Sequence, residues 1–522
     1  MSKKQLQARL SDVSLTMWDK IVTLGNPQKQ LARYKAKAAI ALAGGYKGAS
    51  KSRRQTANWS TTDTDADGTN THDLSTLRER SHDLVRNNPL ASGILNTKAT
   101  SVIGSGMKLN ANVDEKVLGI SVEESKILNK QIENEYELFC KQADLRRTFH
   151  FNLMQAVIYN GEKESGDVLI NLPMVQRPES PYFTKIQIIE GDRISNPDNR
   201  PNEETLIDGV EKDRFGAPKW FHIETTPPGQ AWSKRTWSKI KAYGTKTGRK
   251  NAIHYYRMKR PNQTRGVPDL APVIEMFKQL GDFTDAELQA AVISGMFAVM
   301  IKTESDADFG APEATGDTAT PSMDIDMSGG VVTQLMPNET IETVSPDRPN
   351  KNFGGYVDAL IAQIGACLNV PHNLALKKFD SSYSAAKAVL LEAWRYFMAE
   401  RDFFAKQVLD PIYEVFFEEA VALGRINAPQ FLSGDPAIRQ ALLRKNWKGA
   451  ARGAIKELEA VQAAKERIDL GLSSIQAETD EMGTGDWEAN HQQRVIEHEA
   501  RKEAGLLDIA QQVITVEDDE DE

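Results

Sequence analysis

The 522-residue chain has little cysteine, no long apolar run and no apolar stretch at its start. Each of these shortages argues against a particular class of protein. Only Cys140 and Cys367 are present, so a disulfide framework is not expected and a reducing compartment is favoured. The longest apolar run, residues 290–301, is shorter than the roughly 20 residues that span a bilayer. The first fifteen residues, MSKKQLQARLSDVSL, lack the apolar core of a signal peptide. Neither secretion nor a membrane location is predicted.

Motifs for catalysis are missing as well. A Walker A loop needs two glycines at fixed spacing followed by Lys-Ser/Thr, so that backbone N–H groups surround phosphates at a helix start. The segments GTKTGRK (244–250) and GASKS (48–52) lack that spacing and are interpreted as basic loops. The eight histidines form no ligand pair, and there is no Gly-x-Ser-x-Gly or His-Glu-x-x-His motif. We therefore predict no enzymatic activity, no cofactor and no metal site.

Charge is distributed unevenly along the chain. The formal net charge is −9, yet residues 1–54 hold twelve Lys/Arg and two Asp, and the last six residues, 517–522, are all acidic. Such blocks are typical of solvated chain ends, and the alternative is that one end docks a partner. Charge alone leaves both interpretations open.

The local patterns predict a chain of mixed helix and strand. Asp73 is a candidate cap for a helix to about Arg86, and Asn88 for a helix that begins with Pro89. Capping boxes are expected where a helix begins after Ser121 and where another begins after Ser473, which is followed by Gln476. Strands are predicted from β-branched and aromatic segments at 167–172, 184–190, 219–224 and 252–258, with a hairpin turn at 215–218. His222 and His254 alternate within these strands and are interpreted as packing residues.

The second half of the chain is predicted to contain long helices with two interruptions. Apolar residues at helical spacing indicate helices at 270–297 and 356–368, separated by a polar, acidic insert with strand-like segments at 329–335 and 340–346. A very long helix is expected at 382–423, kinked by Pro411. Apolar residues lie on more than one face of it, which predicts burial against more than one neighbour; examples are Trp394, Phe397, Phe403 and Phe404. Between Val370 and this helix lie two adjacent lysines.

The most cationic stretch, residues 232–260, carries ten Lys/Arg, five aromatic residues and no acidic residue. Basic residues interleaved with aromatics can bind single-stranded nucleic acid by charge and stacking. Basic hairpins on solvent-facing surfaces have the same composition, so the segment by itself allows both interpretations.

Several segments, in order and across about four-fifths of the chain, resemble the lambda-type portal (head–tail connector) proteins of tailed phages. They are GGYKGASKSRR followed by Trp59, LRERSHDLVRNNPLASGILNTKATSVIGSG (77–106), IHYYRMKRPNQTRGVPDLAPVIEMFKQLGDFTDAEL (253–288), ETVSPDRPNKNFGGYV (342–357) and LNVPHNLALKKFDSSYSAAKAVLLEAWRYF (368–397). The combination of Arg-Asn-Asn-Pro before a Gly-x-Gly with a later Arg-Pro-x-Gln-x-Arg-Gly-Val-Pro is specific. Two positions depart from the family pattern: many relatives carry arginine where His82 stands and glycine where Asn262 stands.

The resemblance implies an α+β portal fold that is mainly α-helical, with a β-rich wing domain, a helical stem, a small α/β clip and a helical crown. The implied division is a basic N-terminal arm (1–74), a wing that is helical and then β-rich (75–265), a stem helix (266–298), an acidic clip (299–350), a second stem helix (351–369), a tunnel loop (370–383), a long kinked helix (384–430) and a C-terminal helical wing and crown with an acidic tail (431–522).

The resemblance also implies function and partners. Twelve copies would form a ring at one capsid vertex, through which double-stranded DNA enters during packaging and leaves on infection. The other implied partners are the terminase large subunit, the major capsid and scaffold proteins, and the head–tail adaptor proteins. The chain would be assembled in the host cytoplasm and located in the virion, with no membrane contact. Lys377 and Lys378 would form a positive ring at the channel constriction; otherwise they are solvated loop residues.

Two other function classes remain open from the sequence. One is a nucleotide-driven DNA motor, against which the absence of a phosphate loop argues. The other is a monomeric nucleic-acid-binding protein that uses residues 232–260, for which binding would be sensitive to salt and lost when those lysines are neutralised.

Overall fold

The structure is a computed structural model that describes residues 26–42, 49, 54–61, 63–226, 235–295, 299–303, 339–343, 353–378, 383–452, 456–485 and 487–506. The chain divides into one unit formed by residues 1–65 and a second formed by residues 66–522. The described part of the first unit contains helix α3 (Pro27–Leu42), whose side chains are largely exposed.

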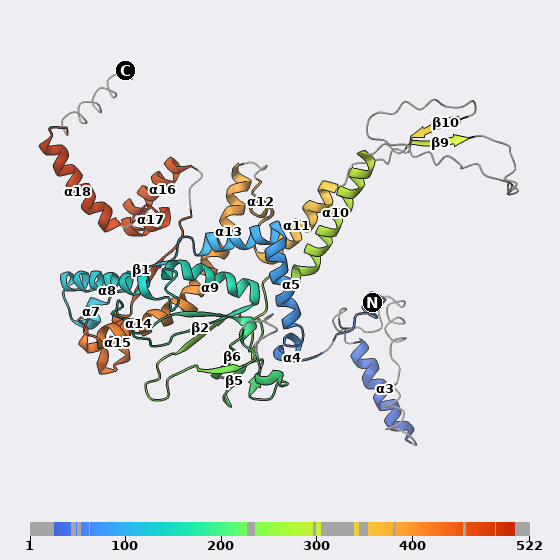
Figure 1. The fold of residues 1–522 in the computed structure, drawn as a ribbon, viewed down its shortest axis with the longest axis horizontal. Coiled ribbons are helices and arrows are strands. Elements are labelled where there is room, and N and C mark those ends of the chain that lie inside the picture. The colour runs from blue at the N-terminus through green and yellow to red at the C-terminus, as the bar shows by residue number, and fades with distance from the viewer. Residues whose placement is uncertain are drawn as a thin grey trace, which may run out of the picture. The chain divides into compact units, whose positions relative to one another are not determined.

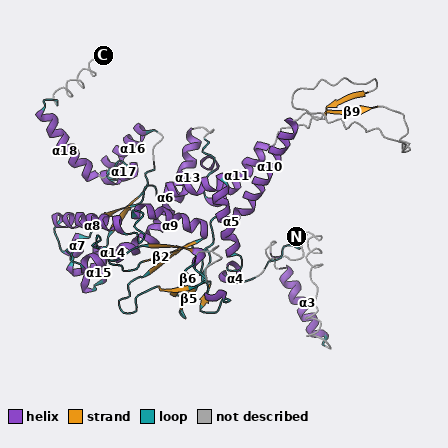
Figure 2. Ribbon diagram, viewed as in Figure 1, coloured by secondary structure: helices purple, strands orange, loops and turns teal. Residues whose placement is uncertain are grey.

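The second unit combines α-helices with antiparallel sheets (Figures 1 and 2). Its helices are α4 (Ala66–Asn70), α5 (Leu74–Asn87), α6 (Pro89–Val102), α7 (Glu115–Leu118), α8 (Val122–Gln142), α9 (Phe151–Ser165), α10 (Ile274–Gly295), α11 (Phe353–Leu368), α12 (His372–Ala375), α13 (Tyr383–Phe404), α14 (Asp410–Ala422), α15 (Pro436–Leu442), α16 (Glu457–Asp469), α17 (Ile475–Met482) and α18 (Trp487–Glu503). No helix in the described part of the chain is long and apolar enough to cross a membrane.

The four strands that the sequence predicts between residues 165 and 260 are confirmed. They belong to a three-stranded sheet of order β3-β2-β8 and a four-stranded sheet of order β4-β5-β6-β7, and further pairs join β1 to β11 and β9 to β10. The strands are β1 (Lys108–Ala111), β2 (Asp167–Asn171), β3 (Gln187–Glu190), β4 (Leu206–Ile207), β5 (Val210–Lys212), β6 (Pro218–Glu224), β7 (Trp237–Lys241), β8 (Ala252–Tyr256), β9 (Val299–Thr303), β10 (Glu339–Thr343) and β11 (Lys445–Lys448).

The predicted hairpin joins β5 to β6 through a turn containing Phe215 and Gly216. Of the strand-like segments in the acidic insert, 340–346 overlaps β10, and 329–335 lies outside the described residues.

Helix starts follow the local sequence signals, with two corrections. The Ser121 and Glu124 capping box is present as predicted. Asp73 is the N-cap of α5, but its side chain makes no capping bond. The prediction of a box at Ser473 is wrong by one residue: Ser474 is the N-cap of α17, and its hydroxyl accepts from the N–H of Ala477 at 3.2 Å. Adjacent serines offer the same local signal, and here the second one has the extended backbone that a cap requires.

The N-cap of α6 is expected to make a measurable contribution to the stability of the chain. Asn88 Oδ1 accepts hydrogen bonds from the N–H groups of Leu90 and Ala91, at 3.0 and 3.1 Å. We expect Asn88→Ala to lower the free energy of unfolding by about 1 kcal/mol, because both N–H groups lose their partner. Chemical denaturation measures the change. Asn96→Ala, an exposed site on the same helix, is the control and should be close to neutral; equal losses for both variants would contradict the capping role.

The long helix of the second half is interrupted just before Pro411. Helix α13 runs into a π-helical turn, Ala405–Leu409, and then into α14, which has Pro411 in its first turn. Proline has no N–H and its ring displaces the carbonyl four residues earlier, so the wider turn is where the helix accommodates it. The helix is irregular next to the predicted position, and the π-helical form of the irregularity was not predicted.

The larger core surrounds this long helix and joins it to α8, α9 and β2. Phe397 and Phe404 are buried there, and Trp394 and Phe403 are partly buried against it. The aromatic residues of α13 therefore contribute largely to packing within the chain, and their burial against more than one neighbour stays a prediction.

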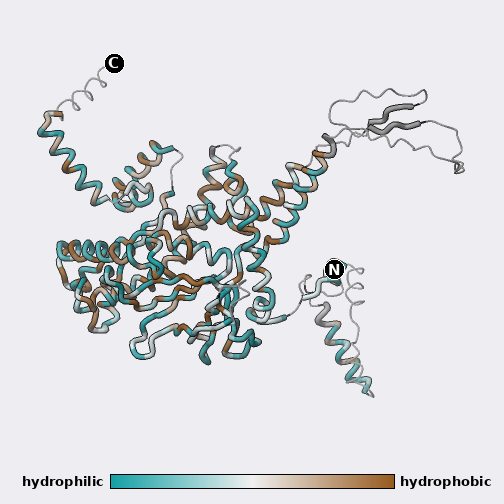
Figure 3. The backbone as a smooth tube through the Cα atoms, viewed as in Figure 1, coloured by the Kyte–Doolittle hydropathy of each residue, from teal (hydrophilic) through white to brown (hydrophobic). Residues whose placement is uncertain are grey.

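A second core is formed by α6, α10, α11 and α12. Helices α10 and α11 pack together, and Phe283 lies against both Phe353 and Tyr356, with ring centroids 5.4 and 4.8 Å apart. Hydrophobic and hydrophilic residues alternate along α10 (Figure 3). Leu288 and Val292 on that helix are more than half exposed. This pair of helices leads directly to the two adjacent lysines.

Candidate nucleic-acid interface

Lys377 and Lys378 lie on a compact turn that follows two helix ends of the same type. Helix α11 ends at Leu368 and Asn369 adopts a left-handed backbone (φ 56°), while the N–H of Val370 donates to Gly365 O at 2.9 Å. This pattern, a left-handed residue followed by a backbone bond five residues back, is a Schellman helix end. The helix thus breaks at Asn369, one residue before the predicted site.

The short helix α12 repeats this ending at the lysines themselves. Lys377 is left-handed (φ 54°) and its N–H donates to Leu374 O at 3.3 Å. The N–H of Lys378 donates to Asn373 O at 2.9 Å. Lys377 thus occupies the position where glycine is the usual residue, because side chains carry a steric cost there. Both lysine side chains are exposed.

The turn is fixed to the second core from both sides. Val370, before α12, is fully buried, and Ala375 within it is 9% exposed. Both belong to the same cluster as Leu95 of α6 and Ile364 of α11. Two exposed lysines therefore follow immediately after a buried anchor, and their backbone position is set by packing rather than by a free loop. Residues 379–382 of the predicted tunnel loop lie outside the described residues.

Gly365 determines how closely the chain turns back after α11. A Cβ atom at Gly365 would lie 2.5 Å from Val370 O, too close for any real contact. We expect Gly365→Ala to lower the free energy of unfolding by about 1–3 kcal/mol, because the backbone around Val370 must shift. Denaturant unfolding at fixed protein concentration measures this loss.

Gly355, in the first turns of α11, is the matched control because a Cβ there meets nothing within 4 Å. Gly355→Ala should be neutral or should stabilise the helix by about 0.5–1 kcal/mol. Destabilisation of the same size by both substitutions would contradict the close approach at Gly365.

The basic segment 232–260 is placed differently from the lysine pair. Its cations make contacts within the chain: Arg235 with Glu224 at 3.2 Å, Lys239 with Glu211 at 3.4 Å, and Arg257 with Glu400 at 2.6 Å. Among its aromatic residues Tyr255 is buried, Trp237 donates to Ser195 Oγ, Tyr256 donates to Gln263 O, and Tyr243 is 47% exposed. Trp232 lies outside the described residues. Much of this segment is used in the fold.

No sequence pattern predicted the buried ionic cluster that joins the two sheets to the segment before α10. Asp167, at the beginning of β2, is fully buried and accepts from Arg265 Nε at 2.5 Å and from Arg78 Nη2 at 2.8 Å. Burial by itself would raise the pKa of Asp167, but the two guanidinium groups outweigh it and hold the pKa well below its usual range. His254, expected to be a packing residue, also contacts Asp167, at 3.1 Å from Nε2 to Oδ2.

Arg265 belongs to the Arg-Gly-Val-Pro motif quoted above, and its role in this structure is architectural. Its guanidinium donates to the carbonyls of Ile194 and Gly191, at 2.8 and 2.6 Å. A Cβ at the next residue, Gly266, would lie 1.8 Å from Gly166 O. Arginine and glycine at these positions therefore hold the segment that leads into α10 close to the β-rich region.

The two departures from the family pattern are accommodated locally. Asn262 has φ 64°, a conformation that asparagine tolerates better than most residues and that glycine adopts freely. His82 lies with Nε2 3.0 Å from Ser165 Oγ, next to the ionic cluster.

Comparison with known proteins defines the family. The model described as "Phage portal protein, lambda family" matches residues 52–401, so the chain belongs to the lambda family of phage portal proteins. It is 25% identical over 453 residues to portal protein B of Escherichia phage lambda, covering 82% of this chain and 84% of that protein. It is 27% identical over 478 residues to the portal protein of Escherichia phage N15, covering 87% and 89%.

Solved structures with a similar arrangement come from gene transfer agent particles. A chain from the neck of the native particle has a TM-score of 0.42 and 10% identity, covering 79% of this chain and 94% of that one. A chain from the neck of the empty particle has a TM-score of 0.44 and 10% identity, covering 84% and 100%.

Proposed function

We propose that the chain forms a homo-oligomeric ring of twelve copies at one capsid vertex, and that the ring is the channel through which double-stranded DNA is packaged and ejected. Membership of the lambda portal family supports the ring and the virion location. The single observation that carries the channel assignment is the turn after α11, which holds Lys377 and Lys378 exposed on a buried anchor.

A confined ring of cations suits a conduit for a whole genome. Contacts to phosphate oxygens carry no sequence information, so every part of the genome can pass. Each additional phosphate contact also adds salt-sensitive affinity, and a channel with many cations would hold DNA rather than release it. Two lysines per subunit in an acidic chain, with a net charge of −9, provide contact without tight binding.

The remaining parts follow the division implied by the family. Helices α10 and α11 would be the stem, and the hairpin β9–β10 part of the clip, which would dock the terminase large subunit and later the head–tail adaptor proteins. The β-rich region and the C-terminal helices would form the wing and crown, facing major capsid and scaffold proteins. The basic arm would contact adjacent subunits or partners inside the capsid, so its removal should impair ring formation or head assembly.

In this account the chain has no enzymatic role, and the energy for DNA movement comes from a separate terminase. Measurable ATP hydrolysis by the pure protein would instead support the nucleotide-driven motor.

Counting copies by mass photometry tests the proposal against the monomeric nucleic-acid-binding protein. We expect discrete assemblies dominated by one copy number. A protein that stays monomeric over a range of salt and concentration, and that binds DNA through residues 232–260, would favour the alternative. The internal contacts of Arg235, Lys239 and Arg257 make that outcome unexpected.

A further inference from the structure

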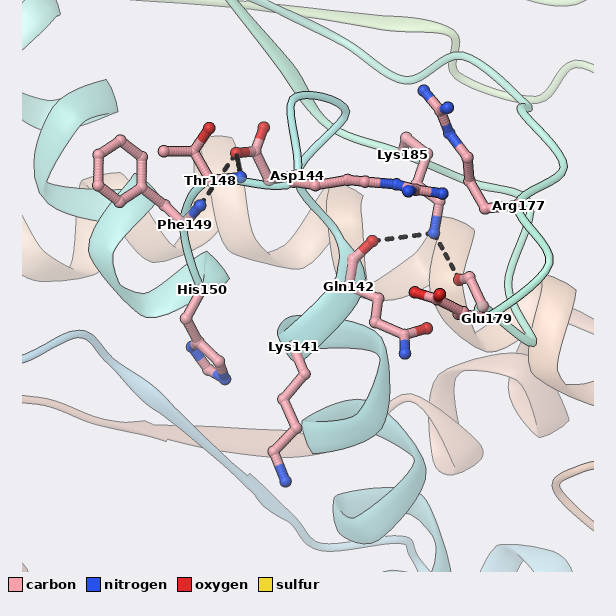
Figure 4. Close-up of a pocket in the computed structure, with 11 residues that line it drawn as sticks. Lys141, Gln142, Asp144, Thr148, Phe149, His150, Arg177, Glu179 and Lys185 are labelled. Carbon is pink, nitrogen blue, oxygen red and sulfur yellow. Dashed lines mark hydrogen bonds between the residues drawn. The ribbon is translucent and has the colours of Figure 1, made fainter.

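A basic pocket lies at the C-terminal end of α8, between the loop at 143–150 and the loop at 173–185. Its volume is about 270 Å³, enough for a side-chain carboxylate or a phosphate group. Figure 4 shows Arg177 and Lys185 on one side of it and Lys141 and His150 on the other. The charged residues that line it are Lys141, Arg147, Arg177 and Lys185, with Asp144 and Glu179 as the carboxylates.

One of the two carboxylates is already committed to the backbone. Asp144 accepts hydrogen bonds from the N–H groups of Arg146 at 2.9 Å, Thr148 at 2.8 Å and Phe149 at 3.1 Å. These bonds hold the intervening Arg147 in a left-handed conformation (φ 58°). The loop is therefore formed in advance, with Arg147 at the pocket wall.

Lys141 lies 4.0 Å from Glu137 on α8. The other three cations that line the pocket, Arg147, Arg177 and Lys185, make no such pair among the described residues. Lys185 Nζ is held in place by Gln142 O at 2.9 Å and Ser180 Oγ at 2.5 Å. Burial lowers the pKa of Lys185, and the nearby charges of Arg177 and Arg147 lower it further, against the opposing effect of Glu419. Like charges gathered around a cavity are unfavourable until an anion enters it.

An exposed apolar stripe begins at the same pocket. Phe149, which lines the pocket, is 50% exposed, and Leu153 and Val157 on α9 are 54% and 49% exposed. Leu153 and Val157 are spaced by four and lie on one side of α9, and Phe149 precedes the N-cap of this helix, so we call the three exposed side chains the apolar stripe. A matching ligand must supply acidic groups to the pocket and apolar groups to the stripe.

We propose that the pocket and the stripe bind the acidic C-terminal segment of this chain, residues 507–522. The sequence there ends ITVEDDEDE, with Val513, Ile514 and Val516 directly before six acidic residues. It thus has apolar and acidic groups side by side, as the stripe and the pocket require. The proposal goes beyond the channel function and does not depend on it.

A nucleic-acid phosphate would satisfy the pocket charge but would leave the stripe exposed to water. The stripe presents three large apolar side chains, and their burial is favourable by roughly 25 cal/mol per Å². An acidic peptide with apolar residues satisfies both features, and so it is favoured over nucleic acid.

Hydrogen–deuterium exchange on the full-length chain tests the proposal. Neutralising the six terminal acids (Glu→Gln and Asp→Asn at 517–522) should accelerate amide exchange in residues 144–150 about tenfold, since docking opposes local opening. Adding the free peptide 507–522 to this variant should restore protection, and the further change Arg177→Glu should abolish the rescue. Lys126→Glu, an exposed cation elsewhere on α8, is the control and should leave the rescue intact.

Two results would overturn the proposal. The first is unchanged exchange in the neutralised variant together with no protection by the peptide. The second is protection of residues 144–150 by inorganic phosphate or by duplex DNA but not by the peptide, which would make the pocket a general anion site. Neither result bears on ring formation, so failure here is distinguishable from failure of the channel proposal.

Discussion

Replacing Asp167 by asparagine is expected to lower the free energy of unfolding by about 3–5 kcal/mol. The substitution conserves shape but removes the carboxylate that Arg265 and Arg78 share, so that Arg265 keeps only Asp208 and Arg78 only Asp192 as a counter-charge. Breaking a buried ion pair costs far more than an exposed pair contributes. Denaturant midpoints measured at one fixed protein concentration report the loss.

The matched control is the exposed pair Lys278–Asp282 on α10. Asp282→Asn should change stability by less than about 1 kcal/mol, because solvent screens the pair. Asp208→Asn, at the partly exposed edge of the cluster, gives a measurable intermediate case if Asp167→Asn does not fold. Equal effects for Asp167→Asn and Asp282→Asn would contradict the structural role of the cluster.

The same cluster predicts a pH dependence. The pKa of Asp167 is lower in the folded than in the unfolded chain, so its contribution to stability is present above the unfolded value of about 3.9. It is lost as pH falls below that value towards the folded pKa. The wild type should therefore lose stability on acidification more steeply than Asp167→Asn, which lacks this carboxylate, and denaturant midpoints measured over a range of pH report the difference.

Reversing the charge of the lysine pair is expected to have the largest functional effect. With Lys377→Glu and Lys378→Glu, every subunit would present two carboxylates to the DNA, and phosphate repulsion should reduce packaged DNA about tenfold or more. A reconstituted packaging reaction with the cognate heads and terminase measures this. Rings should still form, since both side chains are exposed.

Two further variants separate charge from backbone shape. Lys377→Arg with Lys378→Arg keeps both charges and should package normally. Lys377→Gly with Lys378→Gln removes both charges while glycine suits the left-handed backbone at 377, so a packaging defect there must come from charge. Normal packaging by the glutamate variant would show that the lysines are merely solvated loop residues.

Features with local causes could be predicted from the sequence, and those with distant causes could not. The cap at Asn88 and the box at Ser121 depend on residues within four positions, and both are present. The Asp167–Arg265 pair joins residues 98 positions apart, and no local pattern links them. The helix break that contains the lysine pair could be predicted from the sequence. The left-handed turn at Lys377 could not, because it depends on the packing of Val370 and Ala375.

The basic segment illustrates the limit of composition. Ten cations without an acid suggest a nucleic-acid surface, yet the acids that pair with them come from other parts of the chain, such as Glu211 and Glu400. Counting charge within a window misses partners that the fold brings together.

Electron microscopy of the purified protein tests the central claim most directly. We expect closed rings with a central hole wide enough for duplex DNA, and with the turn that carries Lys377 and Lys378 facing that hole. Compact monomers under all salt and concentration conditions, or rings in which these lysines face outward, would contradict the channel assignment.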